Sequence, residues 1–202
     1  MADDAHTDEE RTTIILSEGF AYDLFAKYML EQGWTIRIRE VHGEEPDRSI
    51  EEVWGKDGVP AAVHYMDNQR LWTQYLWIHG RTIWPLVVEL RPRFGGPTAP
   101  ELIDQLSEAE TRGDLIVGLI QLAIGWSDAF DANVMEIFKH YAKHDDSRVR
   151  TAVVQALLFN KWPQGLPVLK DFADADPAAD VRDFAHKVYD NVTKAQSKTS
   201  SP

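Results

Sequence analysis

The stretch DSRVRTAVVQALLFN, residues 146–160, decides the fold of half of this chain. An acidic residue precedes apolar residues at helical spacing, which predicts a capped helix over residues 147–160. The Val149-Arg150 pair returns as Val181-Arg182, 32 positions later, inside a similar segment. A weaker copy over residues 114–124 repeats the apolar spacing 34 positions earlier. A period of this size is typical of stacked helical pairs.

Helix-length segments follow one another around this stretch, and each is closed by a short polar turn. The predicted helices are Pro100–Glu110, Asp114–Trp126, Ala132–Lys143, Ser147–Asn160, Gln164–Ala173 and Ala178–Val192. We therefore expect an α-helical repeat unit over residues 99–192. A polar, disordered tail is expected over residues 193–202.

Residues 149–157, VRTAVVQAL, with Asp146 three positions before them, resemble the second helix of HEAT-like repeats of the short bacterial kind. In that family an acid caps the helix, the valine enters the core and the arginine reaches a neighbouring turn. The later copy departs from the pattern, since Phe184 stands where the first copy has Ala152. HEAT-like modules mostly bind proteins, and their relatives include chromophore lyases of light-harvesting complexes and a class of DNA glycosylases. The resemblance implies a helical stack that presents a binding surface.

The first half of the chain differs in composition and in periodicity. Five of the seven tryptophans lie between Trp34 and Trp84, and the segment RFGGPT, residues 93–98, separates them from the helices. Residues 17–33 have helical spacing, with Ser17 as a candidate N-cap and Gly33 as the stop. One amphipathic helix is therefore expected at the start of this half.

The residues after this helix indicate a strand and then a loop. Residues 35–40 alternate in polarity, which would place Ile36 and Ile38 on one buried face. Residues 43–58 are charged and are interrupted by proline and glycine. We expect a long loop there, with one helical turn near residues 50–53.

Two further runs of strand-forming residues complete this region. Residues 61–66 and 71–79 flank the turn-forming residues 67–70, which predicts a hairpin. The simplest assembly is one helix packed on a three-stranded antiparallel sheet over residues 17–94. Together with the helical repeats, this makes the fold class α+β.

Charge and composition limit the classes of partner. The formal net charge is −12, from 33 acidic and 21 basic residues. Such a field repels phosphate and anionic lipid, so nucleic-acid and membrane partners are disfavoured and a partner with a basic surface is favoured. Residues 1–16 begin with an acidic, polar segment, which predicts a disordered N-terminus without a signal peptide and a cytoplasmic protein. The absence of cysteine excludes disulfides and thiolate chemistry.

Aromatic and histidine side chains gather in and around the predicted hairpin and supply a candidate ligand site. Its residues are His64, Tyr65, Trp72, Trp77, His79, Arg81 and Trp84. Pairing through residues 67–70 would set His64 opposite Thr73, roughly 20 Å from His79, which is too far for an acid–base pair. Ordinary strand histidines are the alternative interpretation. If the tryptophan-rich sheet is exposed, a homodimer is an expected use of it.

Other clusters have simpler explanations than chemistry. His140 and His144 share a helix face, but a helix-terminal histidine followed by the N-cap Asp146 explains them without a metal. Arg37 and Arg39 could grip a phosphate or carboxylate, although pairing with the acids around them is the plainer account. No catalytic residue, metal ligand or cofactor is assigned, since the sequence contains no familiar nucleophile or phosphate-binding motif.

These features favour a non-catalytic protein-interaction module, such as an adaptor, an inhibitor or an immunity-type binding protein. The alternative is a small-molecule-binding protein or a non-standard enzyme whose aromatic and histidine site lies between the sheet and the helical stack. The aromatic pocket would support the alternative, whereas an exposed, partner-binding surface would support the first function.

Overall fold

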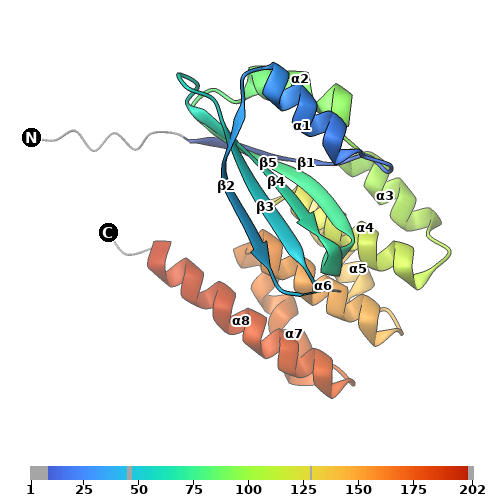
Figure 1. Cartoon of the computed structure of the whole chain (residues 1–202). Helices are drawn as coiled ribbons and strands as arrows, with labels where there is room; N and C mark the ends of the chain where they lie inside the picture. Colours follow the sequence, from blue (N-terminus) through green and yellow to red (C-terminus); the bar gives the residue numbers. More distant parts are fainter. Residues whose placement is uncertain (1–8, 45–46, 128, 200–202) are drawn as a thin grey trace, which may run out of the picture. The chain divides into compact units, whose positions relative to one another are not determined.

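The computed structural model describes residues 9–44, 47–127 and 129–199, and the chain divides into two compact units, Met1–Thr98 and Ala99–Pro202. Figure 1 shows strands and two helices in the first unit and helices alone in the second. The α+β class predicted from the sequence is confirmed. None of the described helices combines the length and hydrophobicity that a membrane span requires.

The first unit contains a five-stranded sheet instead of the three strands expected. All neighbouring strands are antiparallel, in the order β1-β5-β4-β3-β2. Their bounds are β1 Glu10–Ile15, β2 Thr35–His42, β3 Ser49–Gly55, β4 Ala61–Asn68 and β5 Thr73–Gly80. The hairpin of β4 and β5 was predicted, whereas β1 and β3 were assigned to a disordered N-terminus and to a loop.

Physical reasons explain why these two strands escaped prediction. Strand β1 follows an acidic segment, yet Ile14 and Ile15 are buried. Strand β3 carries a glutamate, Glu52, on its buried face beside Trp54. Arg39 Nε lies 3.2 Å from the Glu52 carboxylate, and the Tyr22 hydroxyl donates to it at 2.5 Å. A strand with one buried face usually has apolar residues at every second position. Because Glu52 occupies one of these positions in β3, the sequence does not show the pattern.

Two helices cover one face of the sheet. Helix α1, Tyr22–Glu31, begins later than expected: its N-cap is Ala21 and not Ser17, and Gly33 with φ +80° follows its end. Helix α2, Trp84–Phe94, was not predicted. Its prolines at positions 85 and 92 are poor helix signals, although the first lies in the opening turn, where proline is tolerated. The core between helices and sheet includes Phe25, Met29, Trp54, Val63, Tyr65, Leu76, Ile78, Val87 and Leu90.

Strand β2 is an edge of the sheet and is not half-buried. All eight of its residues are exposed, and its register shifts between Ile36 and Ile38. This irregularity places Ile36 opposite Trp54 and Ile38 opposite Val53, so the two isoleucines lie on different faces. The expectation that they share one buried face is wrong.

The connection between β4 and β5 sets the register of the hairpin. The 3₁₀ turn η1, Gln69–Leu71, follows Asn68, whose side-chain oxygen accepts from the Leu71 amide at 3.1 Å. Trp72 then adopts a left-handed conformation with φ 48°. The turn therefore spans residues 69–72, two residues beyond the predicted 67–70, and Asn68 pairs with Thr73.

The second unit is a helical stack. Its elements are α3 Ala99–Glu108, α4 Arg112–Gly125, α5 Ala132–Tyr141, α6 Ser147–Asn160, η2 Pro163–Gly165, α7 Leu166–Ala175 and α8 Ala179–Thr199. Helix α4 packs on α6, and α6 packs on α8, while α3 packs on α4 and α7 on α8. The residues expected in a disordered tail from position 193 continue α8 up to Thr199.

Polar caps and apolar faces together explain this stack. Thr111, Asp131 and Asp146 accept hydrogen bonds from the first amides of α4, α5 and α6. Val149 and Val181, the valines of the Val-Arg pairs, are fully buried in one continuous core. The regular spacing of such residues is the reason why these helices were predicted closely from sequence.

Candidate functional site

Two histidines meet on the sheet face that α1 and α2 leave uncovered. Val63 and Tyr65 point into the helix-covered core, so His64 between them points to the other face. In the observed register His64 pairs with Trp77, and His79 lies two positions further along β5. The two imidazole Nε2 atoms are 3.0 Å apart. The predicted separation of roughly 20 Å is wrong because the turn lies further along the chain than residues 67–70.

A carboxylate faces the other ring nitrogen of each histidine. Glu51 Oε1, from β3, lies 2.6 Å from His64 Nδ1. Glu9 Oε1, just before β1, lies 3.6 Å from His79 Nδ1. The described part of the chain thus contains a row of two histidines flanked by two glutamates, in the order Glu51, His64, His79 and Glu9.

The Trp77 ring contacts both imidazole rings. Its ring centroid lies 4.6 Å from that of His64 and 4.8 Å from that of His79, with the second pair stacked at 27°. Tyr75 lies on the same face, two positions earlier on β5. Burial raises the pKa of Tyr75 to about 12, and the negative charge of Glu51 adds to the shift. This tyrosine therefore stays a neutral hydroxyl at ordinary pH.

The contacts restrict where protons can lie. A carboxylate accepts hydrogen bonds, so the 2.6 Å contact places a proton on His64 Nδ1, and in the neutral ring Nε2 then carries a lone pair. That lone pair faces His79 Nε2 at 3.0 Å. Either one proton or one cation must lie between the two nitrogens, because two lone pairs at this distance repel. The arrangement can share a proton or ligate an ion.

The other predicted site residues do not join this pair. Tyr65 lies in the core on the opposite face, and Trp72 is exposed in the turn between β4 and β5. Arg81 follows β5, and its amide donates to the Pro60 carbonyl at 3.0 Å. Trp84 is the exposed first residue of α2. Of the seven residues, His64, Trp77 and His79 are the three that the structure brings into contact.

Glu51 and Glu9 were missed because their segments were assigned to a loop and to a disordered end. The segment SIEEVW, residues 49–54, does not alternate in polarity, so no local pattern marked the strand that carries Glu51. Glu40 and His42 of β2 lie close to Glu51. One possible ligand atom from each of the three residues lies within 4.8 Å of the other two. His42 Nε2 is already 3.2 Å from Glu40 Oε2, and both side chains are exposed.

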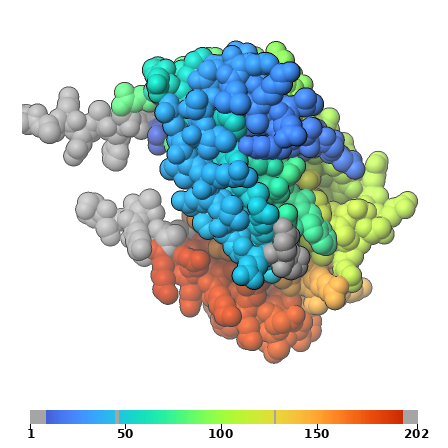
Figure 2. All heavy atoms as spheres, in the orientation of Figure 1, coloured from blue at the N-terminus to red at the C-terminus, as the bar shows by residue number. Residues whose placement is uncertain are grey.

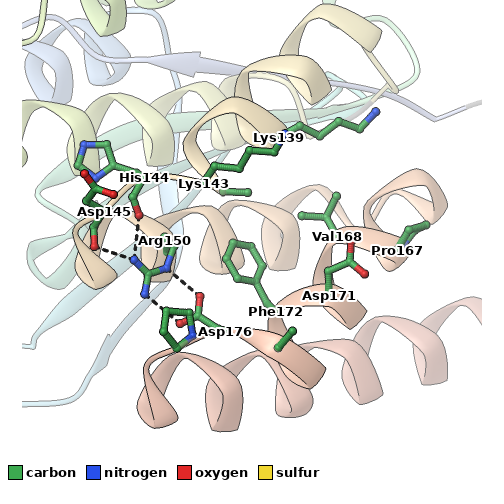
Figure 3. A pocket seen from close by; sticks show the side chains of 13 residues that line it. Lys139, Lys143, His144, Asp145, Arg150, Pro167, Val168, Asp171, Phe172 and Asp176 are labelled. Atoms are coloured by element: carbon green, nitrogen blue, oxygen red, sulfur yellow. Dashed lines mark hydrogen bonds and ion pairs between the residues drawn. The ribbon is translucent and has the colours of Figure 1, made fainter.

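The second unit contains a pocket of about 660 Å³ at the turns beside α6. Figure 3 shows Arg150 at one end of it, bound to Asp176 and to the turn that carries His144 and Asp145. The remaining lining residues are Lys139, Ala142, Lys143, Pro167, Val168, Asp171, Phe172, Ala175 and Pro177. Of the three cationic lining residues, Arg150 is buried, whereas Lys139 and Lys143 are exposed.

Most hydrogen-bond donors of the Arg150 side chain are already bound to other residues of the chain. Its Nε and Nη2 donate to the two Asp176 oxygens at 2.8 and 2.9 Å, and its Nη1 donates to the His144 and Asp145 carbonyls, both at 2.8 Å. Four of its five N–H groups are occupied in this way. His144 Nδ1 accepts from the Asp146 amide at 3.0 Å, which supports a turn-forming role. This pocket is built around a structural ion pair, and the histidine pair of the first unit is the stronger candidate site.

Comparisons with known proteins add no assignment: no family model, curated protein or solved structure matches this chain. Two features of the chain's own residues indicate possible functions. These are the exposed edge strand β2 and the contact between His64 and His79.

Proposed function

We propose that this protein is a non-catalytic interaction module that binds another protein along strand β2, acting as an adaptor, an inhibitor or an immunity-type partner. The observation that carries the proposal is the complete exposure of this eight-residue edge strand. Among the described residues β2 pairs with β3 on one side only, so its other side presents unpaired backbone groups. Such an edge is a template for one more strand.

Side chains of β2 add apolar contact area to this edge. Ile36, Ile38 and Val41 are 41%, 50% and 50% exposed. Strand β2 contains neither the lysines nor the prolines that often protect an edge strand, and its protective features are Arg37, Arg39, Glu40 and the register shift between Ile36 and Ile38. Figure 2 shows the light-blue surface of this segment facing the viewer. The exposed apolar residues of this edge favour a partner strand that covers them.

Trp72 provides a second anchor for a partner. It is 72% exposed, in a turn fixed by the Asn68 side chain and by the Gln69 amide, which donates to the Arg48 carbonyl. Because Asn68, Ser49 and His42 are paired positions on successive strands, this turn lies at the same end of the sheet as the end of β2. Exposed tryptophans are common energetic anchors of protein interfaces.

Charge selects the kind of partner. The chain carries a net charge of −12, so a basic protein gains from long-range attraction. A second copy of this chain would bring together two strongly acidic molecules. We therefore assign the edge to an extended segment of a basic partner protein, and self-association is an outcome that the test must distinguish.

We further infer that the helical stack is of the HEAT-like kind. The support comes from repeated contacts: Arg112 reaches the cap residue Asp146 at 3.2 Å, and Arg150 reaches Asp176, which accepts from the Ala178 amide before α8. In each case an arginine of one helical pair contacts an aspartate between the two helices of the next pair. Stacks of this kind commonly bind proteins, which agrees with the proposed function.

The experiment is a quantitative pull-down from the native cells with the full chain as bait, compared between variants. Ile38→Lys and Val41→Lys place a charge on the edge, and Val88→Lys, at a residue 72% exposed on α2, is the matched control. We expect one basic protein to be recovered stoichiometrically with the wild type and with Val88→Lys, and to be lost with the β2 variants. The purified partner is then titrated against each variant by calorimetry.

Other outcomes would overturn the proposal. These are the recovery of no stoichiometric protein, a partner bound equally well by all variants, or self-association that the Ile38→Lys change abolishes. Circular dichroism of each variant separates loss of binding from loss of fold.

A second candidate function, small-molecule binding or non-standard catalysis, is favoured by one observation, the 3.0 Å contact between His64 and His79. A thermal-shift screen tests it. We would expect a bound compound to raise the melting temperature of the wild type and to lose this effect in the double variant His64→Ala/His79→Ala. The function is excluded if no compound shifts the wild type and the double variant is active in a cellular assay.

A further inference from the structure

We propose that His64 and His79 bind one divalent transition-metal ion through their Nε2 atoms, with Glu51 and Glu9 orienting the two rings. The inference is independent of the β2 proposal, since it rests on other residues. Its basis is the geometry of four side chains and their chemistry.

The distance between the two nitrogens matches that of two ligands on one ion. With metal–nitrogen bonds of about 2.0–2.1 Å, two imidazole nitrogens lie about 2.9 Å apart at a 90° angle and about 3.3 Å apart at the tetrahedral angle. His64 Nε2 and His79 Nε2 are 3.0 Å apart. The two side chains come from adjacent antiparallel strands, so rigid backbone fixes their approach.

The carboxylates supply the second requirement of a histidine metal site. Metal-binding histidines usually donate their other ring N–H to a carboxylate or carbonyl, which fixes the tautomer and raises ligand basicity. Glu51 Oε1 lies 2.6 Å from His64 Nδ1, and Glu9 Oε1 lies 3.6 Å from His79 Nδ1. When His79, like His64, carries its proton on Nδ1, the Nε2 lone pairs of both rings are available to one ion. A cation removes the repulsion that this arrangement would otherwise cause.

The ligand chemistry selects the class of ion. Imidazole nitrogen suits Zn²⁺, Cu²⁺, Ni²⁺ and Co²⁺, whereas Mg²⁺ and Ca²⁺ require oxygen ligands. Two protein ligands leave further coordination positions for water or for a donor atom of a bound ligand. His79 is 28% exposed and His64 is 12% exposed, so an ion can reach the pair from the His79 side.

The test uses the full chain after treatment with a chelator. Calorimetric titration with ZnCl₂ should give one site, and Cu²⁺ should quench tryptophan fluorescence at the same stoichiometry because Trp77 touches both rings. His64→Ala and His79→Ala should each weaken Zn²⁺ binding by more than about tenfold, and Glu51→Gln by about tenfold, the usual effect of losing an orienting partner. Trp77→Phe should keep Zn²⁺ binding and lose most of the quenching.

Two control variants separate this site from others. His42→Ala removes the exposed group of Glu40, His42 and Glu51, and His140→Ala removes a histidine of α5. Both should bind Zn²⁺ as the wild type does. The proposal is overturned if the wild type binds no Zn²⁺, if His42→Ala or His140→Ala abolishes binding, or if His79→Ala leaves it unchanged. His79→Gln, which keeps a polar side chain of similar reach, replaces His79→Ala if that variant fails to fold.

Discussion

Arg150 forms hydrogen bonds with the turns that precede α6 and α8. Its side chain is 8% exposed and that of its partner Asp176 is 2% exposed. Replacing Arg150 with alanine leaves the Asp176 carboxylate buried without its cation, and breaking such a pair destabilises a protein by about 3–5 kcal/mol. We expect Arg150→Ala to lower the free energy of unfolding by this amount, measured by urea denaturation followed by circular dichroism at 222 nm.

Arg112→Ala is the matched control for this prediction. Arg112 also pairs with an N-cap aspartate, Asp146, at 3.2 Å, but its side chain is 49% exposed. Exposed pairs contribute about 0–1 kcal/mol, so this variant should be nearly as stable as the wild type. Equal losses in the two variants would show that burial of the Arg150 pair is not what matters.

The same ion pair makes the stability of the helical stack depend on pH in the acidic range. Burial works to raise the pKa of Asp176, but hydrogen bonds from Arg150 and from the Ala178 amide outweigh it and lower the pKa below its ordinary value. Because the folded-state pKa is depressed, the pair stabilises the fold fully above the unfolded-state pKa of about 3.9. This stabilisation is lost as the pH falls below that value and through the folded-state pKa.

The predicted consequence concerns the slope of stability against pH. Asp176→Asn should be less stable than the wild type at neutral pH, and the difference should narrow as the pH falls from about 5 to about 2. Urea midpoints measured across this range at constant ionic strength provide the comparison. Parallel curves for the two proteins would show that Asp176 titrates alike in the folded and unfolded chains.

At the scale of the elements, Gly80 is the position where three strands of the sheet come closest. It pairs with Glu10 of β1 and with Ala61 of β4, and its φ is +149°. A Cβ there would lie 2.2 Å from the Pro60 carbonyl oxygen and 2.6 Å from the Ala61 Cα. Since the backbone of Pro60 and Ala61 must move, Gly80→Ala should cost at least about 3 kcal/mol, from strain and overpacking together.

Gly58→Ala separates backbone strain from steric overlap. Gly58 has φ +79°, but no atom lies within 4 Å of an added Cβ. The expected cost is therefore only about 1–2 kcal/mol, that of a left-handed backbone. Thermal melts of both variants followed by tryptophan fluorescence make the comparison, and a milder effect at Gly80 than at Gly58 would contradict the tight contact described.

The elements predicted from sequence were those whose own residues carry the signal. Helix α6 matched its predicted bounds because Asp146 caps it and apolar residues recur at helical spacing. Strand β3 could not be recognised, because its inward Glu52 is stabilised by Arg39 and Tyr22 from other elements. The residues that stabilise Glu52 are distant from it in sequence, so the polarity pattern of residues 49–55 does not reveal them.

The candidate site shows the same limit on a finer scale. His64, Trp77 and His79 were named from sequence, but their contact depends on where the hairpin turns. The Asn68 side chain and the left-handed Trp72 move the turn by two residues, which changes the offset of His64 from His79 from six positions to two. Register is set by turn geometry, and a small displacement of the turn decides whether the site exists.

At the scale of the whole molecule, the chain has two hydrophobic cores that share no residue. The core of the first unit is built from residues between Ile14 and Leu90, and that of the second from residues between Ala99 and Val192. We therefore predict that the two units unfold in separate steps, each responding to changes in its own core.

Two optical probes report on the two units. Five of the seven tryptophans lie between Trp34 and Trp84, so fluorescence follows mainly the first unit, whereas the second unit supplies most of the helix seen by circular dichroism at 222 nm. Arg150→Ala should move the circular-dichroism midpoint and leave the fluorescence midpoint in place, and Gly80→Ala should do the reverse. If either variant moves both midpoints equally, the chain unfolds as one cooperative body. Effects confined to one probe would mean that the proposed binding edge on β2 and the helical stack can be altered independently by mutation.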